Sequence, residues 1–159
     1  MPAAATPSRL TDRKHAAILD AAVAESDAQR AAIWRLREEH SEGQKREGAS
    51  VKNDVSVPVS KVPEFIRKAT IACETLIPGI RAVPFGHMGD GNIHFTVYPR
   101  RDDPALSDAV IEAVEDEVQA LGGSFSAEHG VGLSKKPSMK RRKDPVALDI
   151  MRAVKAAVD

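Results

Sequence analysis

Hydrophobic and polar positions recur along the chain with two periods, which predict where helices and strands lie. A spacing of three to four residues predicts helices at 11–45, 60–77, 103–122 and 144–158, the first of them parting near Ser26. Alternating or short apolar runs predict strands at 51–57, 83–85, 93–97 and 124–127. Residues 1–10 are rich in Ala, Pro and Ser, and we expect them to be disordered.

The order of these elements predicts the fold class. From Val51 onward it is β-α-β-β-α-β, the ferredoxin-like arrangement, so we expect an α+β domain over 11–159. An antiparallel sheet would carry two helices on one face, with further helices at the N- and C-termini. Strand alternation directs these apolar side chains towards the helices: Val55, Val57, Ile93, Phe95 and Val97. The opposite face would carry Lys52, His94 and Glu128, either as a site or as an ordinary solvated surface.

The composition of the chain limits the classes of binding partner and the compartment that we expect. The chain has 23 basic and 23 acidic residues, so no net field favours nucleic acid or an anionic membrane. The single cysteine, Cys73, leaves no internal disulfide and fits a reducing compartment. No apolar run approaches the ~20 residues of a membrane span. We therefore expect a cytoplasmic protein with no nucleic-acid partner and no membrane span.

Candidate chemistry gathers in two glycine-rich stretches. In the first, Pro84–Tyr98 (PFGHMGDGNIHFTVY), His87 and His94 flank a loop, and a hairpin would bring them together. The second, SAEHGVGLSK, contains Glu128 beside His129. Two histidines and one glutamate are a zinc ligand set that leaves one position open. Judged from the residues alone, the alternative is that the histidines are turn residues without a metal, which is less attractive because three of the five histidines lie in glycine-rich strand ends.

Arg37 lies on the apolar stripe of a predicted helix, together with Ile33 and Trp34. Its stem could lie along the edge of a core. Its planar guanidinium could equally bind a carboxylate. The residues leave these two interpretations open.

Together, GHMGDGNIH and SAEHGVGLSKK resemble the C-terminal domain of FAD-linked oxidases of the vanillyl-alcohol-oxidase type. Within that family they are most similar to the D-2-hydroxyacid dehydrogenases that oxidise D-lactate, D-2-hydroxyglutarate or glycolate. The resemblance continues through IWRLREEH, VKNDVSVP and ALDIMRAVKAAVD, and covers about residues 17–159.

This resemblance implies the substrate- and metal-binding half of a FAD-dependent oxidoreductase that converts a D-2-hydroxy acid into a 2-oxo acid. By the same resemblance, zinc or manganese would be bound by His87, His94 and Glu128. His129 would be the catalytic general base. The substrate contacts would be Arg37, Lys52, Asn92 and Thr96. Many relatives have Asn where this chain has Thr96, which predicts an altered substrate contact.

The flavin-binding domain of the family has no counterpart in this sequence. We therefore expect the chain to bind metal and a 2-hydroxy acid without turnover by itself, with FAD supplied by a flavin domain that is not in this chain. Two protein partners remain open, a separate flavin-binding subunit or a second copy of the chain in a homo-oligomer. One alternative is a non-catalytic ferredoxin-like module that binds a small carboxylate or pairs with a subunit. Another is a metal-dependent hydrolase that uses the two histidines and the glutamate directly.

Overall fold

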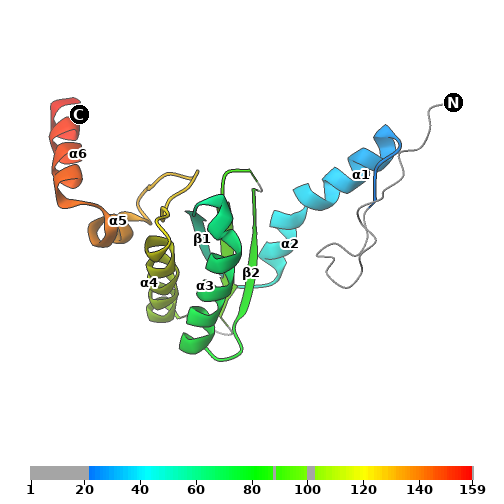
Figure 1. Cartoon of the computed structure of the whole chain (residues 1–159), viewed down its shortest axis with the longest axis horizontal. Helices are drawn as coiled ribbons and strands as arrows, with labels where there is room; N and C mark the ends of the chain where they lie inside the picture. Colours follow the sequence, from blue (N-terminus) through cyan, green and yellow to red (C-terminus); the bar gives the residue numbers. More distant parts are fainter. Residues whose placement is uncertain (1–21, 88, 100–102, 159) are drawn as a thin grey trace. The chain divides into compact units, whose positions relative to one another are not determined.

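A computed structural model describes residues 22–87, 89–99 and 103–158 (Figure 1). The chain divides into two compact units, one ending at Glu47 and the other beginning at Gly48. The predictions for residues 1–10, and for a helix before Ser26, fall almost wholly outside the described residues. No described helix has the length and apolar character needed to cross a membrane.

The first unit contains α1 (Asp27–Glu38) and α2 (His40–Arg46). Ser26 caps α1, since its hydroxyl accepts the backbone N–H of Gln29 at 3.3 Å. This confirms that a helix begins next to Ser26. The helical segment predicted to run on to Lys45 is interrupted at Glu39, which separates α1 from α2.

The second unit holds a sheet and most of the helices. Its elements are β1 (Val51–Ser56), η1 (Val59–Lys61), α3 (Val62–Leu76), β2 (Arg81–Gly86), β3 (Asn92–Tyr98), α4 (Pro104–Ala120), α5 (Lys136–Arg142) and α6 (Pro145–Val158). The sheet order is β1-β3-β2, with both pairs antiparallel. These elements confirm the α+β class.

One apolar core joins the sheet to α3 and α4. Phe95, at the centre of β3, is fully buried and meets Phe65 of α3 edge to face, with ring centroids 5.6 Å apart. Val114 of α4 belongs to the same core, as do the other strand residues predicted to face the helices. The predicted strand phase is therefore confirmed, and the polar side chains between these positions form the opposite face of the sheet.

The predicted fourth strand at 124–127 is wrong. Only one bridge forms there, in which Ser56 and Ser124 exchange backbone hydrogen bonds of 2.9 and 2.8 Å. Beyond it, the Ser124 hydroxyl donates to the carbonyl of Ser126 and accepts its N–H. Serine side chains that bond locally in this way compete with a strand ladder. The segment stays beside β1, since the backbone N–H of Ala127 donates to the carbonyl of Asp54 at 3.2 Å, but it forms no strand ladder.

Glycine ties the hairpin loop to the end of β1. Gly91 has φ +74, and a Cβ there would lie 2.0 Å from the carbonyl oxygen of Val57. The backbone N–H of Val57 donates to the carbonyl of Gly91 at 3.1 Å. The loop that carries His87 is thus held beside the point where β1 ends.

Candidate metal and substrate site

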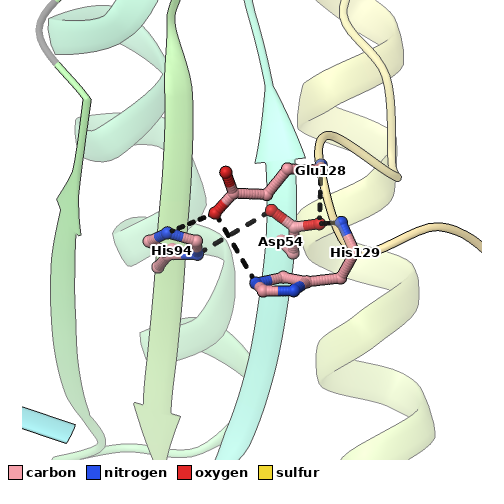
Figure 2. A group of neighbouring side chains, drawn as sticks. All are labelled: Asp54, His94, Glu128 and His129. Carbon is pink, nitrogen blue, oxygen red and sulfur yellow. Dashed lines mark hydrogen bonds and ion pairs between the residues drawn. The ribbon is translucent and has the colours of Figure 1, made fainter.

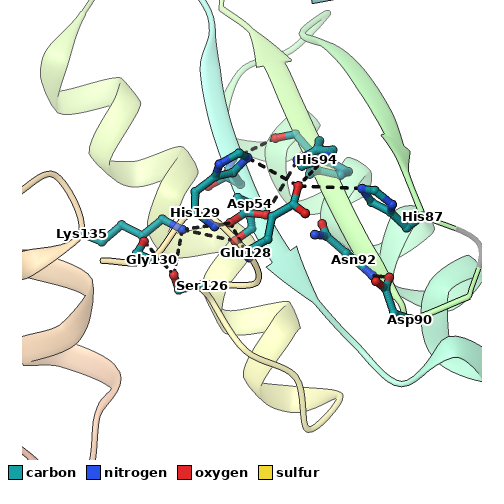
Figure 3. Close-up of polar contacts among 12 residues, drawn as sticks. Asp54, His87, Asp90, Asn92, His94, Ser126, Glu128, His129, Gly130 and Lys135 are labelled. Atoms are coloured by element: carbon teal, nitrogen blue, oxygen red, sulfur yellow. Dashed lines mark hydrogen bonds and ion pairs between the residues drawn. The ribbon is translucent and has the colours of Figure 1, made fainter. Parts of the chain in front are cut away.

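One carboxylate oxygen lies among three imidazoles on the polar face of the sheet. Oε1 of Glu128 is 3.2 Å from Nε2 of His94, 3.6 Å from Nε2 of His129 and 3.8 Å from Nε2 of His87 (Figure 3). We call these four residues the histidine–glutamate cluster. All four were predicted as site residues, and the fold brings them together.

Different elements supply the cluster. His94 lies in the central strand β3, where it is the most buried of the three imidazoles, with 19% of its side chain exposed. His87 follows β2 directly, and its ring centroid is 5.8 Å from that of His94. Glu128 and His129 come from the loop that replaces the predicted fourth strand. If that strand had continued along β1, Glu128 would have moved away from the hairpin loop.

The spacing suits a divalent ion. Zinc binds imidazole nitrogen and carboxylate oxygen at about 2.0–2.2 Å, so two ligand atoms of a tetrahedral ion are about 3.4 Å apart. The three distances around Oε1 of Glu128, 3.2 to 3.8 Å, bracket that value. The donor set therefore fits the metal that the resemblance implies.

Asp54 is a member of the site that the sequence analysis did not single out. A geometric group of possible metal ligands consists of Asp54, His94, Glu128 and His129 (Figure 2). However, Oδ1 of Asp54 faces Nδ1 of His94 at 3.7 Å, whereas Oε1 of Glu128 faces Nε2. The two nitrogens lie on opposite edges of the ring, so we place Asp54 behind His94 and not at the same ion.

The carboxylate of Asp54 is held in a charged state. Its Oδ2 accepts the backbone N–H groups of Glu128 at 3.1 Å and His129 at 3.0 Å, and Nζ of Lys135 lies 3.5 Å away. Burial raises the pKa of Asp54, but the two N–H donors and the charge of Lys135 outweigh burial and lower the pKa below its ordinary value. Asp54 shares the strand face of Lys52, two residues before it, but the register that sets Asp54 opposite His94 is visible only in the folded sheet.

The predicted substrate residues are distributed unevenly. Lys52 and Thr96 face each other across β1 and β3, two positions from the Asp54–His94 pair. Lys52 is exposed, whereas Thr96 and Asn92 are only 2% and 4% exposed. The expectation of an open polar face is thus wrong at these two positions.

Arg37 belongs to α1 in the first unit, where its guanidinium lies 5.9 Å from the centroid of the Trp34 ring. Both side chains are exposed. The structure describes each unit by itself, so the role of Arg37 in substrate binding stays a prediction.

The fold and the site together indicate an α+β domain with a candidate divalent-metal site, formed by three imidazoles and a carboxylate on one face of the sheet. A family model described as "FAD linked oxidases, C-terminal domain" matches residues 8–159. The chain therefore belongs to the FAD-linked oxidase family, and the match spans both units.

Individual relatives agree with this assignment. The D-2-hydroxyglutarate dehydrogenase of Xanthomonas citri pv. viticola is 36% identical over 147 residues, which cover 89% of this chain and 31% of the relative. The enzyme of the same name from Stutzerimonas stutzeri is 36% identical over 149 residues, covering 89% of this chain and 32% of that protein. A mitochondrial D-2-hydroxyglutarate dehydrogenase of Rattus norvegicus is 35% identical over 149 residues, which cover 89% of this chain and 26% of that protein. The chain thus spans about a third or less of the length of these relatives.

Proposed function

We propose that this chain provides the metal- and substrate-binding part of a FAD-dependent enzyme that oxidises a D-2-hydroxy acid to the corresponding 2-oxo acid. The observation that carries the proposal is the position of Glu128, whose Oε1 lies within 3.8 Å of Nε2 of three histidines. The family membership supports the flavin chemistry. The names of the relatives support the substrate class.

The cluster divides into ligands and a base. His87, His94 and Glu128 would hold the divalent ion, zinc or manganese. When bound, such an ion stabilises negative charge on the 2-hydroxyl oxygen, and FAD accepts the hydride that leaves C2. The carboxylate of Glu128 would also offset the ion's positive charge. This division leaves His129 available for proton transfer.

His129 would take the proton of the 2-hydroxyl at Nε2. It is the most exposed imidazole of the cluster, with 66% of its side chain exposed, compared with 40% for His87 and 19% for His94. An imidazole accepts protons readily near neutral pH. The step would balance, because the O–H proton would go to His129, FAD would supply the acceptor for the C2 hydride, and C2 would become the carbonyl carbon of the 2-oxo acid.

Positive charge would hold the substrate carboxylate. Lys52 lies on the same sheet face as His94 and presents an exposed ammonium group. The role of Arg37 rests on the resemblance alone, which implies that its bidentate guanidinium binds the substrate carboxylate. Asn92 and Thr96 would form polar contacts with the substrate, which requires their buried side chains to become accessible when the substrate enters.

Metal content is the first test. Wild-type chain, loaded with Zn²⁺ or Mn²⁺ and then dialysed, should keep about one ion per chain by elemental analysis, because the proposed site offers one set of two histidines and one glutamate for the ion. His94→Ala should lose it. His40→Ala, which removes an imidazole from α2 in the other unit, is the matched control and should retain it. Equal metal content in wild type and His94→Ala would contradict the proposal.

Substrate binding is the second test. Calorimetric titration of the zinc-loaded chain with D-2-hydroxyglutarate or D-lactate should show binding that the L-enantiomers do not match. Lys52→Met should weaken this binding and leave zinc affinity unchanged, since Lys52 supplies charge and no metal ligand. A Lys52→Met variant that binds the acids as wild type does would remove Lys52 from the substrate site.

A further inference from the structure

Asp54 contacts two of the segments that build the histidine–glutamate cluster, namely β3 with His94 and the loop with Glu128 and His129. It lies on β1, directly opposite His94 of β3 in the strand register. Its side chain is only 9% exposed. The catalytic scheme above uses neither of its oxygens, although both face groups of the cluster (Figure 2).

The first oxygen, Oδ2, fixes the backbone of the loop. Two consecutive N–H groups, those of Glu128 and His129, donate to it at 3.1 and 3.0 Å. Lys135 approaches the same oxygen at 3.5 Å and donates to the Ser126 hydroxyl at 3.1 Å. These contacts connect β1 to the loop, so they fix the backbone positions from which the side chains of Glu128 and His129 extend.

The second oxygen, Oδ1, is buried and has no hydrogen-bond partner among the described residues. Nδ1 of His94 lies 3.7 Å from it, slightly beyond a normal hydrogen bond. A buried acceptor without a donor is unfavourable, because the desolvation of its oxygen is not compensated by a hydrogen bond. This buried acceptor therefore indicates that a hydrogen-bond donor faces Oδ1 of Asp54 in the functional state of the site.

Metal binding at His94 would supply that donor. If Nε2 binds the ion, the ring proton must be on Nδ1. Histidines that bind metals almost always donate this second N–H to a carboxylate, a carbonyl or water. In this site the facing acceptor is Oδ1 of Asp54.

We propose that Asp54 is the positioning residue of the metal site: Oδ2 holds the Glu128–His129 backbone while Oδ1 accepts Nδ1–H of His94. The metal half of this inference rests on the function proposed above. Asp54 itself binds no ion. It sets the ring orientation of one ligand and the backbone position of another, together with that of the base.

Two variants of Asp54 separate its two roles. In Asp54→Asn, the amide oxygen can still accept both backbone N–H groups, but the NH₂ group then faces Nδ1–H of His94, donor against donor. Asp54→Ala removes both roles. Asp90→Asn is the matched control, because it makes the same charge change in the hairpin loop. The Asp90 side chain accepts the N–H of Asn92, which an amide oxygen can also do.

Zinc affinity, measured by competition with a chromophoric chelator, should fall by about 10–100-fold in Asp54→Asn, the usual effect of losing such a partner. Asp90→Asn should stay within about threefold of wild type, as expected for a change that leaves the ligands and their partners in place. Heteronuclear NMR of the zinc-loaded wild type should show a His94 Nδ1–H protected from exchange, and Asp54→Asn should lose that protection. Wild-type affinity together with an unchanged His94 signal in Asp54→Asn would overturn the inference.

A metal-free measurement keeps the inference separate from the proposed function. Amide exchange at Glu128 and His129 should accelerate in Asp54→Ala and stay near wild type in Asp54→Asn, while Phe95 in β3 remains protected as the folding control. Unchanged exchange in Asp54→Ala would reject the backbone role. If the wild type binds no zinc, both the proposed function and the role of Asp54 Oδ1 as acceptor for His94 are rejected. The amide-exchange data still decide whether Oδ2 holds the Glu128–His129 backbone.

Discussion

Oε1 of Glu128 lies 3.2 Å from Nε2 of His94, although one residue belongs to a loop and the other to the central strand, with the whole of α4 between them in the sequence. This contact depends on the irregular segment after Ser124, which makes one isolated bridge to β1 in place of a regular strand. The cluster is therefore a product of loop geometry as much as of strand pairing.

The division of roles between His87 and His129 predicts different effects of their removal. His87→Ala should lower zinc affinity by more than about 100-fold, beyond the range seen for residues that only contact a ligand. His129→Ala should keep zinc within a few fold, because its imidazole is assigned to proton transfer. Chelator competition on both variants measures this. Loss of zinc in His129→Ala, with unchanged zinc affinity in His87→Ala, would mean that His129 is the zinc ligand and that His87 is not.

Gly91 should tolerate no side chain, because its φ of +74 is unfavourable for other residues and a Cβ would collide with the Val57 carbonyl. Gly91→Ala should destabilise the fold by more than about 1 kcal/mol in urea unfolding. Gly89→Ala is the matched control, since a Cβ at Gly89 meets no atom within 4 Å. It should change stability by less than about 0.5 kcal/mol. Equal effects of the two substitutions would contradict the role assigned to Gly91.

Arg142 should be the main attachment of α5 to α4. Its guanidinium, 14% exposed, donates to Glu115 at 3.1 Å and to Asp116 at 2.6 Å. The Glu115 side chain is 4% exposed, so Arg142→Met would leave a buried carboxylate with only the more distant Arg141 as an ion-pair partner and should cost about 3 kcal/mol. The neighbouring Arg141 is 33% exposed and approaches Glu115 only to 3.5 Å. Arg141→Met should cost less than about 1 kcal/mol in the same thermal or urea unfolding experiment.

Cys73 should make the fold less stable in alkali. It is fully buried in the core, and burial raises the pKa of its thiol from 9.0 to about 11. Between these pH values the unfolded chain has lost the thiol proton while the folded chain keeps it, so stability falls as pH rises. The difference in unfolding free energy between wild type and Cys73→Ala should shrink by about 2 kcal/mol from pH 8 to 11. A constant difference across this range would show that the folded thiol titrates normally.

Periodicity alone was enough to predict most of the architecture. The phase of β1 and β3 was readable because Val55 and Phe95 alternate with polar neighbours, and both apolar side chains lie in the core formed with α3 and α4. The fourth strand was predicted wrongly, because the hydroxyls of Ser124 and Ser126 bond to the local backbone, a competition that a propensity pattern does not reveal.

The sequence by itself determined which chemical groups are present: three imidazoles and a carboxylate in glycine-rich segments, and the faces on which strand residues lie. Tertiary structure decided which of these groups meet. The pairing of Asp54 with His94, the turn of Glu128 towards the hairpin and the burial of Thr96 depend on strand register and loop closure. Such non-local contacts form only when distant segments pack together, whereas residue type and periodicity are local properties that can be read along the chain.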